Sequence, residues 1–368
     1  PPLRVIPPAC DDLVRQPAWE DAMKRDVGLD VSQATTAICV VDGEGRTLAE
    51  SVTATEPCAI AAFVRQRAPD AIRIGMETGP LAVWLWNELL ALDLPVICMD
   101  ARHANAGLKV MLAKTDRNDA AGIAQLVRTG WFRQVHVKAE ASYAVRAELA
   151  TRTLLVRMRC DLENQIRGLL KTFGLVVGKA PSRLAKRAHE IVADELTDKP
   201  EFASLVESLL AMRADVVERI AELDTKLRAR AKTTPVCRRF MTVPGVGPIT
   251  ALAVWAGIDD AGRFARSRNV GAYFGLTPRR YASGEVDRSG RITKRGDGNV
   301  RTLLYEAANV LLLKISRTSS LREWGLAIAQ RSGFKKAKVA VARKLAVLLH
   351  RLWRDGTEFR WNAAPVAA

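Results

Sequence analysis

The sequence predicts an α/β N-terminal domain followed by mainly helical segments, and three observations support this. Short apolar runs alternate with helix-like segments between residues 26 and 130, a pattern typical of strand–helix–strand folds. Apolar residues then recur every three or four positions from 140 to 232, which indicates long amphipathic helices. Turn-rich basic stretches and further helical patterns follow from residue 236. A chain of 368 residues accommodates these parts as two or three domains.

The expected N-terminal sheet has five strands within a domain spanning 26–135, after a flexible arm at 1–25. The first three strands are DVGLDVSQ from residue 26, TAICVVD and GRTLAESV, and Gly43 and Gly45 are turn signals between the last two. The fourth is AIRIGME (71–77) and the fifth is LPVICMD (94–100). Helices are expected over 57–68, over TGPLAVWLWNELLAL, and from near Asp116 onward. This order predicts a mixed sheet with helices packed on it.

Two long helices resembling a coiled coil are expected over 140–232, separated by the basic segment KAPSRLAKR. They would form either an intramolecular hairpin or an oligomerisation stalk, and the pattern favours neither. The apolar positions are Leu155, Met158, Leu162, Ile166, Leu169 and Phe173, then Phe202, Leu205, Leu209, Met212, Val216, Ile220, Leu223 and Leu227.

A mainly helical domain is expected over 236–356, with a tail at 357–368. VPGVGPITA (243–251) predicts a tight turn between helices, as in helix-hairpin-helix elements, where backbone N–H groups hold a DNA phosphate. A Gly- and Arg-rich stretch from GLTPRRYASGE onward then turns helical. The segment FKKAKVAVARKLAVLLHRLW is expected to pack its Val/Leu face on this domain.

Charge divides the chain unevenly and indicates a phosphate polymer as partner. Residues 26–130 hold 9 Lys/Arg and 13 Asp/Glu, whereas the remainder holds 47 and 27. A basic body would hold such a polymer while the acidic head acts on it. No apolar run is long enough for a membrane span, and the first residues lack the order of a signal peptide. Six scattered cysteines without a CxxC pair fit a reducing cytoplasm rather than a zinc knuckle or disulfide framework.

Four carboxylates are candidates for a metal site: Asp30 within the first strand, Glu77 at the end of the fourth, and Asp116 with Asp119 at the start of a helix. The last two are three residues apart and share one helix face. Four converging carboxylates would repel each other unless divalent cations lay between them, and hard oxygen ligands favour Mg²⁺ or Mn²⁺. The competing interpretation is that the aspartates only cap the helix or offset its dipole.

The motifs DVGLDVSQ, GMETG, KTDRNDA, PGVGPITA, GLTPRRYASGE and ITKRGDGNVRTLLYEAA, in this order, resemble those of DEDD-type insertion-sequence transposases. The resemblance covers residues 26 to about 350. It implies an N-terminal domain like a Holliday-junction resolvase, with the RuvC-like ribonuclease H fold, and a metal site made by Asp30, Glu77, Asp116 and Asp119. It further implies a bacterial protein that acts on donor and target DNA, a structured guide RNA, and a dimer or tetramer joined by the long helices.

The resemblance also implies a nucleophilic serine, which maps to Ser283 of YASGE, followed by Gly284. Ser289 of RSGR also precedes a glycine and is a rival. Residues 261–301 hold ten Lys/Arg and three acids, and guanidinium groups would stabilise charge on a transferring phosphoryl group. The candidate nucleic-acid-binding residues are Arg279, Arg280, Arg288, Arg291, Lys294 and Arg295, together with Lys114 and Arg117.

Three functions follow from these features. The first is a recombinase that cuts and rejoins DNA by serine attack, which conserves the energy of the broken bond. The second is a metal-dependent junction endonuclease that activates water, and the third is a non-catalytic nucleic-acid-binding protein. No general base for the serine is obvious, because His103, His136, His189 and His350 are all remote in sequence from Ser283. The resemblance implies that the metal-bound acidic cluster, from the same or another subunit, completes the site, so that an aspartate such as Asp116 or Asp119 takes the serine proton.

Overall fold

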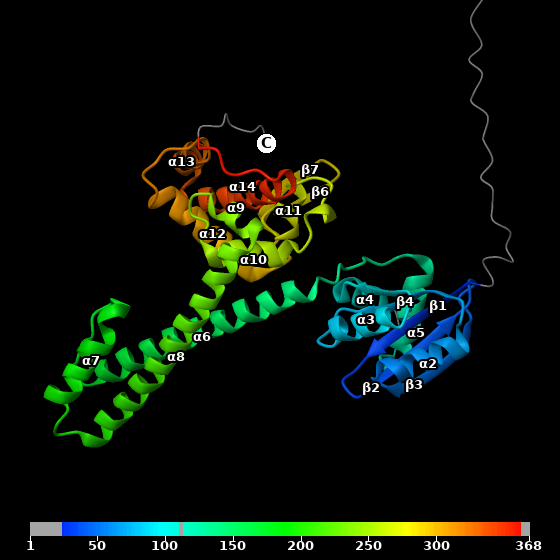
Figure 1. Cartoon of the computed structure of the whole chain (residues 1–368), viewed down its shortest axis with the longest axis horizontal. Helices are drawn as coiled ribbons and strands as arrows, with labels where there is room; N and C mark the ends of the chain where they lie inside the picture. The colour runs from blue at the N-terminus through cyan, green and yellow to red at the C-terminus, as the bar shows by residue number, and fades with distance from the viewer. Residues whose placement is uncertain (1–23, 110–112, 362–368) are drawn as a thin grey trace, which may run out of the picture. The chain divides into compact units, whose positions relative to one another are not determined.

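The computed structural model describes residues 24–109 and 113–361, and the chain divides after Val137 into two compact units (Figure 1). The predicted arm at 1–25 lies outside the described residues up to residue 23, and the predicted tail lies outside them from residue 362. The division of the second unit at 140–232 and 236–356 stays a prediction.

The first unit is built on a mixed sheet of five strands, as the sequence predicts, and the strands lie in the order β3-β2-β1-β4-β5. Strand β1 (Arg25–Val31) lies antiparallel to β2 (Thr35–Val41) and parallel to β4 (Ala71–Glu77). Strand β3 (Thr47–Ala54) is antiparallel to β2, and β5 (Val96–Met99) is parallel to β4.

Helices cover both faces of this sheet, because its central strands β1 and β2 have runs of consecutive buried residues that point to both faces. Val27 and Leu29 belong to the core on the face packed by α2 (Pro57–Arg67) and α3 (Ala82–Ala91). Ala37 and Cys39 of β2 pack against α5 (Asp116–Thr129) on the other face. A short helix α4 (Ala101–Leu108) was not expected from the sequence. Its segment carries little apolar pattern, and its start is fixed by Asp100, which accepts a hydrogen bond from the Arg102 N–H.

The second unit begins with an arm in which α6 (Glu140–Thr172) and α8 (Pro200–Thr233) run side by side (Figure 1). The basic segment expected as a separator folds as a third helix, α7 (Pro181–Glu195), at the end of the arm. Leu184, Ala188 and Ile191 of α7 join the core between the two long helices. Of the apolar positions in the predicted stripes, Ile166, Val216, Ile220 and Leu227 are buried, whereas Met158, Phe173, Leu205 and Met212 are exposed.

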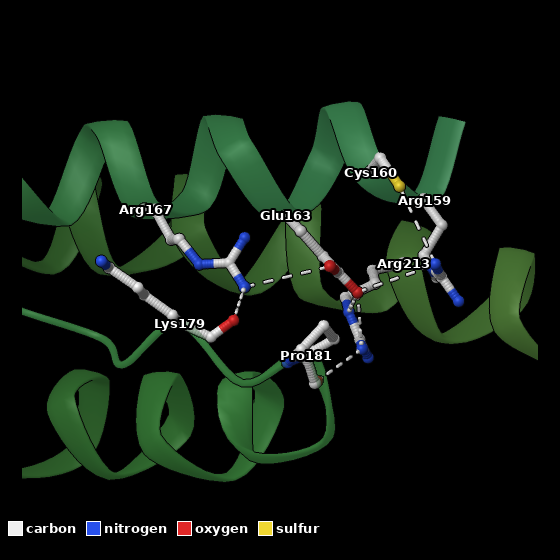
Figure 2. A network of polar contacts seen from close by, with 7 residues as sticks. All are labelled: Arg159, Cys160, Glu163, Arg167, Lys179, Pro181 and Arg213. Atoms are coloured by element: carbon white, nitrogen blue, oxygen red, sulfur yellow. Dashed lines mark hydrogen bonds and ion pairs between the residues drawn. The ribbon is translucent and has the colours of Figure 1, made fainter. Parts of the chain in front are cut away.

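A buried carboxylate pins the connection at this end of the arm (Figure 2). Glu163 of α6 is 3% exposed and accepts two hydrogen bonds from Arg213 of α8, the shorter at 2.9 Å. Arg159 and Arg167 form longer ion pairs with the same carboxylate, at 3.7 and 3.9 Å. Arg213 also donates to the Pro181 carbonyl at the start of α7. One buried acid and its arginine partner Arg213 therefore tie α6, α8 and the start of α7 together.

The C-terminal body of the second unit is helical around one core. Its helices are α9 (Pro235–Met241), α10 (Pro248–Ile258), α11 (Arg268–Tyr273), α12 (Gly298–Leu313), α13 (Ser320–Ser332) and α14 (Phe334–Asp355), with a 3₁₀ turn η1 (Ala261–Arg263). Val341, Leu345 and Leu349 of α14 are buried in this core. The PGVGP turn joins α9 to α10, and Gly245 has φ +87° with its Cα so close to α12 that a Cβ would lie 2.4 Å from the Ala307 oxygen.

The region from Pro278 forms a β-ribbon, which corrects the expectation of an irregular stretch that turns helical. Strands β6 (Pro278–Ser283) and β7 (Val286–Ile292) pair antiparallel through a two-residue turn, with Gly284 at φ +55°. Nearly every residue of both strands is exposed, so no apolar alternation marks the strands in the sequence. The base of the ribbon is clamped, because a Cβ on Gly275 would lie 2.0 Å from the Arg295 oxygen.

Asp297 follows the ribbon and begins α12. Its carboxylate accepts hydrogen bonds from the backbone N–H groups of Asn299 and Val300, and it forms an ion pair with Arg146 of α6. This cap is the point where the loop that ends the ribbon meets the root of the arm.

Candidate active site

The structure brings Asp30 and Glu77 to the same end and the same face of the sheet. Leu29 of β1 pairs with Met76 of β4, so the next residues, Asp30 and Glu77, are neighbours on adjacent parallel strands. Each acid follows a glycine by two residues, and side chains two apart point to the same face. Gly28 pairs with Gly75, and both face α5.

These two glycines let α5 approach the sheet closely. A Cβ added to Gly28 would lie 2.1 Å from the Ala120 oxygen and 2.4 Å from the Ala124 nitrogen. A Cβ added to Gly75 would lie 2.2 Å from Cγ2 of Val127. Any larger residue at Gly28 would push the helix backbone away, and with it the first turn of α5.

That first turn carries Asp116 and Asp119. The side chain of Thr115 caps the helix by accepting a hydrogen bond from the Asn118 N–H at 3.2 Å. Because a threonine caps the helix, the two aspartates are not needed as the N-cap, although negative charge in a first turn also favours the helix dipole.

The four carboxylates influence each other electrostatically. Burial, followed by repulsion from Asp119 and Asp116, raises the pKa of Asp30 to about 6. Burial, followed by repulsion from Asp30 and Asp119, raises the pKa of Glu77 to about 7. The positive charge of Lys114 acts in the opposite direction on both groups. Half-buried carboxylates held this close to like charges favour a bound cation or a bound proton.

The donor set suits a hard divalent cation, because all four groups supply carboxylate oxygens. Within residues 24–109 and 113–361, however, no three His, Cys, Asp or Glu side chains lie close enough together to hold a metal ion as they stand. A cation would therefore have to draw the carboxylates together by side-chain rotation or by a shift of the first turn of α5.

The two basic residues expected beside the acids differ in their surroundings. Lys114 is exposed and lies near enough to Asp30 and Glu77 to affect both. Arg117 is also exposed, and it is paired with Glu50 of β3 through a hydrogen bond and ion pair. Arg117 would have to exchange this partner for a phosphate in order to contact nucleic acid.

Ser283 lies in the second unit, at the exposed end of β6 next to the turn. Ser289 lies within β7, opposite Arg280, so the two serines are on opposite faces of the ribbon. The candidate basic residues around them are all exposed, and Arg280 forms a two-bond ion pair with Asp287.

Two of the histidines, His189 and His350, have hydrogen-bond partners outside the ribbon. His350 is fully buried, with hydrogen-bond distances of 2.9 Å to the Ser267 hydroxyl and the Ala261 carbonyl. His189 lies 3.1 Å from Glu207 on the arm. These contacts give both imidazoles structural roles.

Sequence reasoning missed the residues that hold the acids in place. Gly28, Gly75 and Thr115 fix the sheet-to-helix distance and the start of α5, and Glu50 holds Arg117. A usable signal was present, since Gly-x-Asp and Gly-x-Glu occur at the equivalent positions of two buried strands. A glycine two residues before a functional acid indicates a helix crossing close over the strand.

Known proteins resemble the chain along most of its length. A family model described as "Transposase", of the DEDD type of IS110 elements, matches residues 27–174, and one described as "Transposase IS116/IS110/IS902 family" matches residues 237–322. The chain is 30% identical over 342 residues to a transposase for insertion sequence element IS1111A from Coxiella burnetii, with 92% of each protein covered.

Two further relatives extend this similarity. A probable family 20 transposase from Pseudomonas aeruginosa is 34% identical over 251 residues, which cover 67% of this chain and 74% of that protein. A transposase for insertion sequence element IS1328 from Yersinia enterocolitica is 29% identical over 247 residues, covering 67% and 73%. In the described part of the chain, no helix has the length and apolar character to cross a membrane. The two family matches and the IS1111A relative establish that the chain belongs to the IS110 family of DEDD-type insertion-sequence transposases, which are DNA recombinase enzymes.

Proposed function

We propose that this transposase cuts and rejoins DNA through a covalent serine–phosphate linkage formed by Ser283 and assisted by the acidic residues of the first unit. The observation that carries the proposal is the placement of Asp30 and Glu77 side by side on adjacent strands, where burial first, and then repulsion from neighbouring acids that include Asp119, raises the pKa of both groups. A cluster of carboxylates with perturbed pKa values is typical of a catalytic site rather than of a solvated surface.

The four acids would hold Mg²⁺ or Mn²⁺ through their carboxylate oxygens. When bound, such an ion would neutralise charge on the phosphodiester that is being cut. Lys114 lies beside these acids, and its positive charge lowers the pKa of Asp30 and of Glu77, against the burial and the repulsion that raise them.

The serine step is a phosphoryl transfer. The Ser283 Oγ–P bond forms, the P–O bond to the departing deoxyribose oxygen breaks, and a carboxylate such as Asp116 or Asp119 takes the serine proton. Gly284 after the serine supports this role, since it allows a phosphate to approach the backbone. The reverse attack by a second strand would release the serine and rejoin the DNA. The acids and Ser283 belong to different units, so their meeting, within one subunit or between two, is part of the proposal.

Nucleic acid would be held by the exposed basic residues of the ribbon and the loop that follows it, Arg279, Arg280, Arg288, Arg291, Lys294 and Arg295, with Lys114 and Arg117 beside the acids. The net charge of +20 outside residues 26–130 is sufficient to bind a structured guide RNA as well as DNA, through backbone contacts that carry little sequence information.

We further propose that the arm joins subunits into a dimer or tetramer. Its long helices pack on each other within one chain, yet Leu205 and Met212 of α8 remain 59% and 52% exposed. These residues are seven apart and therefore lie on the same side of the helix. Such a stripe suits a second copy of the same arm.

The experiment is a denaturing gel of end-labelled element-end DNA incubated with the full-length protein, its RNA and Mg²⁺. We expect a protein-linked DNA band that needs Ser283, is lost in Ser283→Ala, and is retained in Ser289→Ala, which is the matched control on the opposite face of the ribbon. Cleaved DNA without a linked band would support the water-activating endonuclease instead. Recombination that persists in Asp30→Ala with Glu77→Ala would rule out the acidic cluster.

A further inference from the structure

We propose that the ribbon face carrying Tyr281 binds an unpaired base of single-stranded DNA by stacking, next to the phosphate at Ser283. The inference rests on the proposed role of Ser283. It assigns a positioning task to Tyr281 and its neighbours on the ribbon.

Strand alternation divides the ribbon into two chemically different faces. Tyr281 pairs with Arg288 and Ser283 pairs with Val286, so these four residues share one face. Arg280, Asp287 and Ser289 share the other face. The proposed nucleophile and the only tyrosine of the ribbon are therefore on the same side, two residues apart.

The arginines on the two faces differ in whether they have an ion-pair partner. On the far face, Arg280 is neutralised by Asp287 through two hydrogen bonds of 2.9 and 2.6 Å. The near face is the one that carries Tyr281 and Ser283, and Arg279 belongs to it because a Cβ on Gly290 would lie 3.8 Å from the Arg279 Cβ as well as beside the Tyr281 ring. On this face, neither Arg279 nor Arg288 has an ion-pair partner within the described residues. The near face is thus the one left with uncompensated positive charge.

The near face also exposes apolar surface. Tyr281 is 48% exposed and Val286 is 57% exposed, although large apolar side chains are usually covered. The Arg288 guanidinium carbon lies 5.5 Å from the centre of the Tyr281 ring, and a Cβ on Gly290 would lie 3.2 Å from Cε2 of that ring. The cation and the glycine backbone hold the ring in place and leave much of it accessible.

The ribbon has a firm base, which gives this face a defined position. The Thr293 N–H donates to the Thr277 carbonyl at 2.9 Å, and the Lys294 N–H donates to the Gly275 carbonyl at 3.1 Å. A Cβ on Gly296 would lie 2.0 Å from the backbone carbonyl oxygen of Tyr273, so the loop after the ribbon lies directly against the end of α11. The strands beyond this base are open to a partner on both faces.

An aromatic ring between unpaired guanidinium groups matches one ligand chemistry best, an unstacked base with its phosphates. Single-stranded nucleic acid offers the base faces that stack on aromatic rings and the phosphates that pair with arginine. A fully paired duplex hides its base faces, so it would use the arginines and leave the ring unused. A strand that is opened for cutting beside Ser283 supplies the required unpaired base.

The test measures binding rather than chemistry, using the full-length Ser283→Ala protein so that no DNA is cut. Fluorescence anisotropy would compare a duplex containing a short single-stranded gap with the same duplex fully paired. Tyr281→Leu keeps apolar bulk and removes the aromatic ring, Tyr281→Phe keeps the ring, and Arg280→Gln removes a charge from the far face. An RNA strand of the same sequence replaces the gapped strand in a parallel arm.

We expect Tyr281→Leu to weaken binding of the gapped DNA by roughly 5- to 150-fold, the loss typical of one stacked base, and to leave the paired duplex within about twofold. Tyr281→Phe should bind both like the parent, and Arg280→Gln should affect both DNAs equally. Equal losses on both DNAs, no loss on the gapped DNA, or a loss seen only with RNA would overturn the proposal. Because binding is measured with the Ser283→Ala protein, the result does not depend on whether Ser283 forms the covalent adduct.

Discussion

At the scale of single residues, the glycines beneath α5 matter as much as the acids that they precede. Gly28 and Gly75 pair across β1 and β4 and face the helix that carries Asp116 and Asp119. Their missing side chains set how near those aspartates lie to Asp30 and Glu77. The close approach depends on the bare backbone at these two positions, so no residue with a Cβ would allow it.

Gly28→Ala should therefore destabilise the first unit, by about 1–3 kcal/mol as for other overpacked core sites. The reason is that its Cβ would meet helix backbone, the Ala120 oxygen at 2.1 Å, which cannot rotate away. Urea unfolding followed by circular dichroism measures the change. Gly79→Ala is the control, because no atom lies within 4 Å of a Cβ there, and it should change stability by less than about 0.5 kcal/mol. Equal effects of the two substitutions would contradict the close-packing argument.

The raised pKa values of Asp30 and Glu77, about 6 and 7, predict a pH dependence of stability. The folded state binds these protons more tightly than the unfolded state, so the stability they contribute is full below about pH 4 and is lost as the pH rises through 6 to 7. Asp30→Asn with Glu77→Gln should raise the melting temperature at pH 8, on the order of 4 °C once solvent screening is allowed for. The difference should shrink towards pH 4.

Divalent cations provide a second measurement on the same pair of proteins. Mg²⁺ at about 100 times its dissociation constant should stabilise the parent by about 2.7 kcal/mol and should leave the double variant unchanged. Differential scanning fluorimetry with and without Mg²⁺, and with Ca²⁺ as a comparison, reports this without any catalytic assay. Equal Mg²⁺ stabilisation of both proteins would remove these two acids from the proposed metal site.

The sequence allowed the acids to be predicted but not their supports. Charge in or beside apolar strands is costly without a partner, and this draws attention to Asp30, Glu77 and the Asp116–Asp119 pair. The ion pair between Arg117 and Glu50 could not be predicted, because it joins residues 67 positions apart and depends on the order of the strands.

At the scale of elements, predictable and unpredictable segments differ in how strongly burial marks their pattern. Strands β1, β2 and β4 bury long apolar runs, and the sequence predicts them close to their observed bounds. The β6–β7 ribbon buries almost nothing, so period-two alternation is absent from its sequence. Helix α7 was not predicted, because its segment begins with a run of basic residues. Leu184, Ala188 and Ile191 nevertheless recur there at helical spacing.

The arm depends on the buried Glu163, and a substitution there tests how. Glu163→Gln keeps the shape and removes the charge that three arginines share (Figure 2), so the second unit should lose about 3 kcal/mol of unfolding free energy. Glu207→Gln is the matched control, since its pair with His189 is exposed, and it should cost less than about 1 kcal/mol. Thermal unfolding monitored at 222 nm compares the two. A Glu163→Gln protein as stable as the control would show that the network adds no stability.

At the scale of the whole molecule, charge and exposed apolar surface support the proposed assembly of several copies on nucleic acid. The positive charge lies outside residues 26–130, while the stripe marked by Leu205 and Met212 stays uncovered within one chain. Sequence periodicity predicts helices of this kind, but it cannot separate side chains that pack within the arm from those left for another copy. Only the pairing of α6 with α8 makes that distinction.

Leu205→Glu with Met212→Glu should therefore convert the oligomer to monomers without unfolding the arm, because both side chains are already exposed. Light scattering coupled to size-exclusion chromatography measures the mass. Ser204→Glu with Ala211→Glu is the control, since it adds the same two charges seven residues apart at exposed positions about 100° around α8 from the stripe. A protein whose mass is unchanged by the first pair, or changed equally by both pairs, would exclude this stripe as the contact.

The carboxylate of Asp297 has a mechanical consequence for the second unit. It caps α12 directly after the loop that ends the ribbon, and it also holds Arg146 near the root of the arm. A movement of the arm that displaces Arg146 would therefore act on the same Asp297 carboxylate that caps α12, directly after the loop that ends the ribbon. Loss of the Asp297 carboxylate would therefore remove both the cap of α12 and its ion pair with α6 at one stroke.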